Sequence, residues 1–401
     1  MKIAVVTTFY PNAADPLRAV FVRNLARTMA VREPVTVILP VALAPGSGMR
    51  RHSSGAHDIP RREVQEGIEV LYPRFRVIPG LSFLNGLSFG RSIMPLLAAL
   101  RQRRAIDIIQ AHCAYPDGVG AARAALQLSL PLAITAHGSD INVYSHRQLL
   151  APQIRWALRR AGGVVGVSRT LCGRITRLVP DITGKLRHIP CAGFDSRIFQ
   201  PMDRLAARAS LGLSPAARVV LFVGQLVPIK GLDILLAAWR MLRERGAAGA
   251  DDRLLLIGEG PLRAELERRA GAAPVAGTVR ILGGMPQSEI ARWLVASNLF
   301  CLPSRSEGFP NVVVEALACG IPVVASDVGG IHEVISSSVN GIMFPSGDST
   351  ALALAIENAL AEDWSTLTIV ASAMPYTWRS IADQNLRFLG EICGASPRTE
   401  G

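Results

Sequence analysis

The segment covering residues 299–326 constrains the fold of this chain more than any other. It begins with an apolar run at residues 299–302 that predicts a buried strand. A polar loop follows, and Pro310 stands where a helix is expected to begin, because the N–H that proline lacks would have no intrahelical partner there. The helix is expected to end near Gly320, and a second apolar strand follows Pro322. Strand, loop, helix and strand in this order predict a βαβ unit of a parallel sheet.

The step from loop to helix in this unit predicts a phosphate site. The first N–H groups of a helix lack intrahelical partners and carry positive partial charge, so they bind phosphate well. Glu307 stands just before the helix and Glu315 lies inside it. A carboxylate is a poor phosphate ligand, but it accepts hydrogen bonds from hydroxyl groups. Two glutamates at this spacing are most often solvated helix charges. Within this frame they indicate a nucleotide sugar, with the sugar at one and the ribose at the other.

These residues also resemble the signature of retaining glycosyltransferase family four. The signature has a glutamate, seven residues and a second glutamate, then small residues and an apolar strand, as in residues 307–326 here. The resemblance implies an α/β chain with the GT-B fold, in which two Rossmann-like, doubly wound parallel-sheet domains border a cleft. It implies an acceptor-binding domain at residues 1–198 and a nucleotide-sugar-binding domain at residues 199–375. A terminal helix at residues 376–395 is expected to pack back on the first domain.

Length and charge agree with two domains of different character. A chain of 401 residues can bury two cores of ordinary size, and 49% hydrophobic with only 5% aromatic residues suits layered α/β domains. Residues 1–200 carry a net charge of +15 and the remainder −3, which gives the total of +12. The basic half favours an anionic partner: nucleic acid, a membrane or a phosphorylated acceptor. No aromatic–basic motif supports nucleic acid, so we expect none as a partner.

Cysteine spacing and hydropathy predict a cytoplasmic protein. The six cysteines are far apart and fit reduced core residues. The N-terminus turns polar too soon for a signal peptide, and no uninterrupted apolar run approaches the ~18 residues of a spanning helix. A peripheral contact with the anionic inner face of the plasma membrane is the alternative to a fully soluble chain. Residues 77–100 are apolar but broken by glycine and proline, and Arg101, Arg103 and Arg104 follow. An interfacial membrane segment and a core helix with a basic last turn both account for this pattern.

In the N-terminal half, the candidate site residues follow the expected strands. Ligands of parallel sheets bind at the carboxyl ends of strands. His112 and Asp117 follow one such strand, and His137 and Asp140 follow the next. The family resemblance implies that His137 faces the donor sugar, whereas His112 either joins the site or packs at its rim. In the first loop this chain lacks the glycine pair that many members carry. Arg18 either replaces that contact or is an ordinary exposed arginine, and we assign it with His112, Asp117 and Asp140 to the acceptor side.

In the C-terminal half, the resemblance implies a donor site around a basic loop. Lys230 matches the lysine that grips the donor diphosphate in the family, and it is one of only three lysines in this chain. Gln225 stands where the family usually has arginine, which implies either weaker donor binding or an arginine supplied from elsewhere. Glycine turns after the strands are expected to contribute backbone contacts. The expected donor-binding residues are Gly224, Gln225, Lys230, Gly258, Gly260, Gly283, Gly284, Glu307, Gly308, Phe309, Pro310, Asn311, Val312 and Glu315.

The resemblance implies retaining transfer of a hexosyl-type sugar from a nucleoside diphosphate sugar to a saccharide acceptor. His137, Lys230 and Glu307 form the expected catalytic set, with Lys230 and the helix start stabilising the leaving diphosphate without metal or another cofactor. Similarity to enzymes of bacterial cell-surface polysaccharide synthesis, including teichuronic-acid type transferases, implies a lipid-diphosphate-linked acceptor. Two alternatives remain open. One is a GT-B sugar-nucleotide epimerase, and the other is an inactive subunit that binds a nucleotide sugar.

Overall fold

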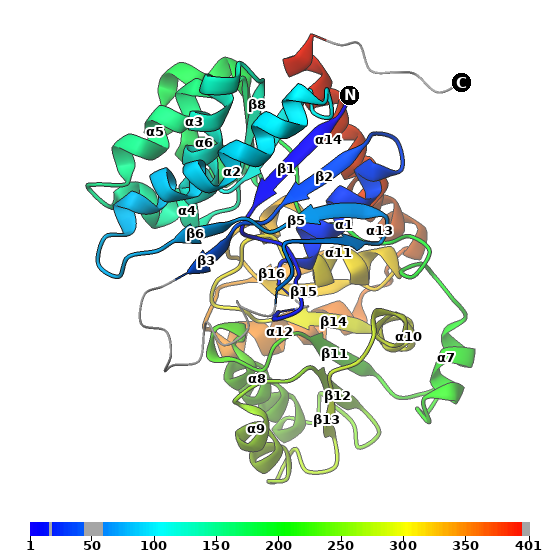
Figure 1. Cartoon of the computed structure of the whole chain (residues 1–401). Coiled ribbons are helices and arrows are strands. Elements are labelled where there is room, and N and C mark those ends of the chain that lie inside the picture. Colours follow the sequence, from blue (N-terminus) through cyan, green and yellow to red (C-terminus); the bar gives the residue numbers. More distant parts are fainter. Residues whose placement is uncertain (16–17, 44–58, 395–401) are drawn as a thin grey trace. The chain divides into compact units, whose positions relative to one another are not determined.

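The computed structural model describes residues 1–15, 18–43 and 59–394 (Figure 1). The chain folds into two compact units: unit 1 is Met1–Cys191 with Trp378–Gly401, and unit 2 is Ala192–Thr377. Unit 2 begins at Ala192, whereas the sequence predicted that the second domain begins at residue 199. The terminal helix belongs to unit 1, and its residues enter the apolar core of that unit.

Unit 1 is built on an eight-stranded sheet with the order β10-β9-β8-β7-β1-β2-β5-β4. Every neighbouring pair is parallel except β4 and β5. The central strands β1, β7 and β8 are fully buried and mainly apolar, as expected for a parallel sheet covered on both faces, although β7 also carries Gln110 and His112. The strands are β1 (Ile3–Thr7), β2 (Val35–Ile38), β4 (Arg62–Gln65), β5 (Ile68–Leu71), β7 (Ile108–His112), β8 (Leu132–Ala136), β9 (Gly163–Gly166) and β10 (Leu186–His188), with β3 (Val41–Leu43) and β6 (Arg74–Arg76) in a small separate sheet.

Two apolar cores cover the two faces of this sheet. Side chains alternate along a strand, so in β1 Ala4 and Val6 enter one core while Ile3 and Val5 enter the other. Helices α2, α3, α5 and α6 gather over the first face, and α1 and α14 pack together over the second (Figure 1). The helices are α1 (Val20–Ala30), α2 (Asn85–Gln102), α3 (Val119–Leu128), α4 (Ser139–Asn142), α5 (Ala151–Arg160), α6 (Arg169–Leu178) and α14 (Trp378–Cys393).

Helix α2 resolves the ambiguous apolar stretch into a helix with two different faces. Its inner face, with Phe89, Ile93 and Leu97, is buried in the core. Gly90 and Gly120 let α2 and α3 approach closely, because a Cβ on Gly120 would lie 2.9 Å from the Gly90 nitrogen. In the described part of the chain, residues 82–102 form the one helix long and apolar enough to cross a membrane. Of its most apolar 18-residue stretch, 28% is buried inside the protein. The helix passes by length and mean hydropathy although polar residues and glycines interrupt its apolar run, as the sequence showed.

Unit 2 contains a six-stranded parallel sheet with the order β13-β12-β11-β14-β15-β16. The predicted βαβ unit is confirmed by β14 (Leu299–Leu302), α11 (Asn311–Ala318) and β15 (Val323–Ser326). The other strands are β11 (Val219–Val223), β12 (Arg253–Ile257), β13 (Val279–Gly283) and β16 (Gly341–Phe344). The other helices are α7 (Arg204–Ser210), α8 (Leu232–Glu244), α9 (Arg263–Ala270), α10 (Gln287–Ala296), α12 (Ser349–Ala361) and α13 (Thr366–Ala373).

Candidate functional site

A lysine–glutamate pair lies beyond the carboxyl ends of β11 and β14 in unit 2. Lys230 ends the short helix η5 (Pro228–Lys230) after β11, and Glu307 lies in the loop between β14 and α11. The Lys230 Nζ is 2.5 Å from the Glu307 Oε1. The Ser304 hydroxyl donates to the same oxygen at 2.6 Å. The side chains of Lys230 and Glu307 remain 22% and 10% exposed, so solvent reaches both. The structure thus brings together two of the residues that the sequence assigned to the donor site.

The loop that carries Glu307 rests directly on a second loop after β15. The Gly330 N–H donates to the Gly308 carbonyl at 2.9 Å. Gly329 has a φ of 59°, and a Cβ there would lie 1.8 Å from the Glu307 carbonyl oxygen. Only glycine satisfies both the left-handed backbone and this approach. Gly329 and Gly330 therefore allow the loop after β15 to pack directly against the loop that carries Glu307.

The N-terminus of α11 is open to an external acceptor of hydrogen bonds. Pro310 occupies the N-cap position, and no side chain caps the helix. The first N–H groups of α11 therefore carry the positive end of the helix dipole without a side-chain partner. Asn311 adds a buried side-chain oxygen that has no hydrogen-bond partner among the described residues. The ring centroids of Phe309 and Tyr376 are 5.5 Å apart, and this contact anchors the residue before the start of α11.

Glu315 is a buried carboxyl group without a partner. It lies on the second turn of α11, is 8% exposed, and accepts no hydrogen bond from any described residue. Burial disfavours the charged form and raises the pKa of Glu315 to about 8. A buried polar group normally has a partner, so Glu315 departs from the usual pattern, and its contact with the donor stays a prediction.

Glycine turns pack against one another at the ends of β11, β12 and β13. Gly258 has a φ of 147°, and a Cβ there would lie 1.8 Å from the Gly224 carbonyl oxygen. The Gly284 N–H donates to the Glu259 carboxylate at 3.2 Å. Close backbone packing thus explains why glycine is needed at Gly258. Donor contact stays a prediction for the turn residues Gly224, Gly258, Gly260, Gly283 and Gly284.

The cation that the sequence lacks at Gln225 is not replaced by Arg305, the arginine next to η5. Gln225 is exposed on the turn after β11. Arg305 donates to the Pro228 carbonyl at 2.6 Å, which ties the two loops together. Its guanidinium is engaged with both Asp233 carboxylate oxygens, at 2.9 and 2.6 Å, and this interaction lowers the pKa of Asp233. Arg305 is therefore paired with Asp233, whereas Lys230 is paired with Glu307 in the loop before α11.

Two histidines from neighbouring strands meet in unit 1. The His112 Nδ1 lies 2.9 Å from the His137 Nε2, and the rings stack with centroids 5.2 Å apart. Burial lowers the pKa of His137 to about 4, and burial together with His137 lowers that of His112. Both rings are neutral near pH 7, so one donates and the other accepts. The His137 Nδ1 has no partner among the described residues, and Phe21 packs 5.3 Å from its ring.

The two aspartates expected on the acceptor side accept hydrogen bonds from groups of the surrounding loops. Asp117 accepts from the Thr8 N–H at 2.7 Å and from the Thr8 hydroxyl. Asp140 accepts from three N–H groups, of Ala114, Gly138 and Ile141. Both carboxyl groups are fully buried, and burial raises both pKa values, that of Asp117 to about 8. In this structure they hold loops together, and acceptor contact stays a prediction for Asp117 and Asp140.

Comparison with known proteins decides the family. The family description "Glycosyltransferase Family 4" matches residues 19–192, and "Glycosyl transferases group 1" matches residues 217–362. A putative teichuronic acid biosynthesis glycosyltransferase of Bacillus subtilis is 30% identical over 362 residues, covering 89% of this chain and 88% of that protein. The chain belongs to glycosyltransferase family 4. A D-inositol 3-phosphate glycosyltransferase of Segniliparus rotundus is 32% identical over 64% of this chain and 60% of its own length.

Solved structures confirm the fold of this family 4 glycosyltransferase. The Anabaena protein HepE in complex with UDP matches with a TM-score of 0.71 and 23% identity, covering 98% of this chain and all of that one. The lipopolysaccharide outer core galactosyltransferase WaaB, in its apo form, matches with a TM-score of 0.68 and 14% identity over 98% of this chain and 99% of that one. The two parallel sheets and these matches make the chain a GT-B protein.

Sequence reasoning missed two parts of the glycosyltransferase's candidate site. The sequence pattern does not single out Ser304, whose hydroxyl donates to Glu307 three residues later. The pair Gly329-Gly330 follows the next strand, and its contact with the Glu307 loop depends on long-range packing that sequence spacing does not reveal. Arg18 is exposed, and its charge favours the ionised form of Asp117, although burial dominates that pKa.

Proposed function

We propose that this chain is a retaining glycosyltransferase that moves a hexosyl group from a nucleoside diphosphate sugar to a saccharide acceptor. The observation that carries the proposal is the Lys230–Glu307 pair at the uncapped N-terminus of α11. A cation and free helix N–H groups suit a diphosphate, and a carboxylate beside them suits a sugar hydroxyl. Glu315, buried without a partner farther along α11, suits the ribose.

The proposed reaction breaks the bond between the anomeric carbon and the diphosphate oxygen and forms a bond from that carbon to the acceptor oxygen. The leaving diphosphate takes the acceptor proton on the same face of the sugar. Lys230 and the start of α11 stabilise the charge that develops on the diphosphate, so the reaction needs no metal. Glu307 positions the sugar. The neutral His137 ring offers a hydrogen bond to a sugar hydroxyl.

The proposed acceptor is linked to a lipid diphosphate, and the protein works at the cytoplasmic face of a membrane. Support comes from the outer face of α2, where a cavity of about 420 Å³ is lined by apolar side chains such as Met94, Leu126 and Trp156. Arg91 and Arg123 stand at the same cavity, and the Arg123 guanidinium lies 5.4 Å from the centre of the Trp156 ring. Apolar surface beside cations matches an anionic lipid interface. The relative from Bacillus subtilis, whose name places it in teichuronic acid biosynthesis, agrees with a cell-surface product.

Donor binding is tested by thermal shift against a panel of UDP- and GDP-sugars. A ligand at about 100 times its Kd stabilises the folded chain by about 2.7 kcal/mol, which a melting curve resolves easily. The nucleotide sugar that gives a shift is then incubated with the protein and candidate acceptors. Transfer rates are measured with and without EDTA, and NMR gives the anomeric configuration of the product. Retained configuration and unchanged rates in EDTA are expected. An inverted product refutes the mechanism, and no shift with any nucleotide sugar refutes the donor site.

Membrane association is tested by co-sedimentation with anionic and neutral vesicles. Arg101, Arg103 and Arg104 are exposed at the C-terminal end of α2. Each basic group near an anionic surface contributes about 1 kcal/mol, and the attraction decays over about 8 Å at physiological salt. Changing all three to glutamine should therefore release the protein from anionic vesicles, and added salt should do the same.

The matched control for this experiment removes three exposed arginines from unit 2, namely Arg240, Arg268 and Arg269. This variant loses the same charge and should sediment with vesicles as the wild type does. Equal loss in both variants would mean that net charge alone attracts the chain. No preference of the wild type for anionic over neutral vesicles at low salt would refute the membrane proposal and favour a soluble acceptor.

A further inference from the structure

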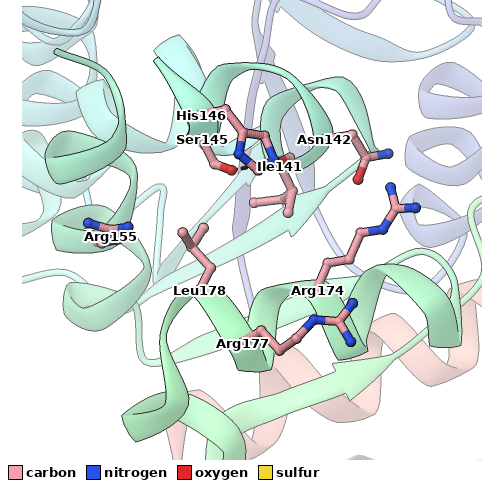
Figure 2. A pocket seen from close by; sticks show the side chains of 8 residues that line it. All are labelled: Ile141, Asn142, Ser145, His146, Arg155, Arg174, Arg177 and Leu178. Carbon is pink, nitrogen blue, oxygen red and sulfur yellow. Dashed lines mark hydrogen bonds between the residues drawn. The ribbon is translucent and has the colours of Figure 1, made fainter. Parts of the chain in front are cut away.

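A second cavity in unit 1 is lined by basic side chains. It has a volume of about 400 Å³ and lies among α4, the short helix η3 (Tyr144–His146), α5 and α6 (Figure 2). Arg155 comes from α5, and Arg174 and Arg177 come from α6. His146 and Asn142 line the cavity from above in the view of Figure 2, and Leu178 forms part of its floor. A volume of this size is that of a small-molecule site.

The three arginines are not neutralised by the protein. No carboxylate lines the cavity. Within residues 1–15, 18–43 and 59–394, none of Arg155, Arg174 and Arg177 forms an ion pair with a carboxylate. By contrast, Arg159, on the same helix as Arg155, is paired with Asp181 at 2.9 Å. Three like charges around one hollow repel one another, so an anion bound among them would lower the free energy of the assembly.

The chemistry of the lining selects a phosphate group. Guanidinium groups bind phosphate oxygens through two parallel N–H bonds, and several arginines around one anion is the arrangement that phosphate recognition uses. Asn142 can add amide N–H donors, and His146 a ring N–H. Figure 2 shows the Arg174 side chain extended from α6 toward Asn142, so donors from α4 and α6 converge on one side of the cavity.

The cavity adjoins His137 through a single helical turn. Helix α4 begins two residues after His137 and ends at Asn142, whose N–H donates to the Gly138 carbonyl at 2.7 Å. A Cβ on Gly138 would lie 3.7 Å from the Asn142 Nδ2, so this amide stands next to the residue that follows His137. Four helical residues span about 6 Å. The cavity and His137 therefore lie on either side of one helical turn of unit 1.

We infer that the cavity of Arg155, Arg174 and Arg177 binds the phosphate or diphosphate group of the acceptor. The inference rests on the proposed function for the identity of the ligand as acceptor, whereas anion binding by the cavity stands on the geometry alone. The acceptor saccharide then lies toward His137, and its phosphate is held by the arginines. The group can come from a soluble sugar phosphate or from a lipid-linked diphosphate, because both present the same oxygens.

Arginine footprinting tests the site without needing the true acceptor. The full-length protein is treated with phenylglyoxal, which modifies free guanidinium groups, with and without inorganic pyrophosphate, and each arginine is read by mass spectrometry. Pyrophosphate should slow modification of Arg155, Arg174 and Arg177 severalfold. Arg160 and Arg169 are exposed arginines of the same helices α5 and α6 that do not line the cavity, so they should react at an unchanged rate.

The controls separate this site from the donor site and from a membrane surface. Protection should persist in Lys230→Ala, which removes the basic residue proposed to bind donor phosphate in unit 2. Equal protection of Arg160 and Arg169 would mean that pyrophosphate only screens charge, and absence of protection would overturn the inference. Vesicles of phosphatidic acid form the second arm. Protection by vesicles with none by pyrophosphate would also overturn it, because the cavity would then be a membrane contact and not a phosphate site.

Kinetics of the double variant Arg174→Ala/Arg177→Ala then link the site to the reaction. Losing two charge-assisted hydrogen bonds should raise the KM for a phosphorylated acceptor by roughly 10- to 100-fold. The KM for the nucleotide sugar and its slow hydrolysis in the absence of acceptor should not change. Equal KM values for wild type and variant would overturn the acceptor assignment. Transfer that fails in the wild type as well, despite intact pyrophosphate protection, would refute the proposed function and leave the anion site standing.

Discussion

Replacing Glu315 by glutamine tests whether burial of this carboxyl group lowers the free energy of unfolding. The Glu315 carboxyl has an ordinary pKa of 4.5, and burial raises it to about 8 in the folded protein. The unfolded chain therefore loses this proton near pH 4.5, while the folded chain keeps it until about pH 8. Between these values the unfolded state binds fewer protons, so the free energy of unfolding falls as the pH rises.

The size of the effect follows from the two pKa values. One pKa unit corresponds to about 1.4 kcal/mol, so the cost of keeping Glu315 buried reaches about 4 kcal/mol at pH 8 and is about 1 kcal/mol at pH 5. Glutamine has nearly the same shape and does not ionise, so Glu315→Gln escapes this cost. For a unit of this size, a difference of about 3 kcal/mol corresponds to roughly 5–15 °C in Tm.

Differential scanning calorimetry of the full chain at about pH 5 and about pH 8 measures this difference. The transition of unit 2 should rise in Glu315→Gln at the higher pH and change little at the lower one. Glu244→Gln is the matched control, because Glu244 is exposed on α8 and paired with Arg240. A Tm difference between wild type and Glu315→Gln that is the same at both pH values would refute the argument from burial.

Three further predictions concern the candidate site. Lys230→Ala should lower kcat more than it raises the donor KM, because the ammonium acts on charge that appears in the transition state. Steady-state kinetics check this, and wild-type turnover would remove Lys230 from the mechanism. Gln225→Arg should tighten donor binding in calorimetry, since it restores a cation to the turn after β11; weaker binding would show that the glutamine makes a contact of its own. His112→Phe keeps a ring beside His137 but removes the nitrogen 2.9 Å from it, so kcat should fall about tenfold with the donor KM unchanged. Unaltered kcat would reduce the histidine pair to packing.

The sequence predicted those parts of the fold in which single proline or glycine residues set the ends of helices and strands. Pro310, Gly320 and Pro322 mark the ends of α11 and the start of β15, and each acts through its own backbone geometry. The contact between His112 and His137 depends instead on register. His112 pairs with Thr135 across β7 and β8, so its neighbour in space is set by the order of the strands. Spacing along the chain carries no information on that order.

Other features could not be predicted because their partners are backbone groups. Asp117 and Asp140 follow strands as catalytic carboxylates do, but each accepts from backbone N–H groups of other loops or its own, and the sequence does not reveal a backbone donor. Helix α2 was ambiguous for a related reason. One pattern of apolar residues and glycines serves both a close contact with α3 and an exposed apolar face, and only the packed structure shows that both are present.

Asp117, Asp140, Glu307 and Glu315 are buried or half-buried carboxyl groups that differ in the donors of their hydrogen bonds. Asp117 accepts from the Thr8 N–H and hydroxyl groups of the loop after β1, and Asp140 accepts from the Ala114 N–H of the loop after β7 as well as from its own loop, so both carboxyl groups tie separate loops together. Among the described residues, Glu307 accepts from the side chains of Lys230 and Ser304, and a ligand can displace or join side-chain donors. Glu315 accepts from no described residue. The cost of an unmet buried carboxyl is tolerated where a ligand later removes it. If a donor binds as proposed, we therefore expect the energies of Glu307 and Glu315 to change most and those of Asp117 and Asp140 to change least.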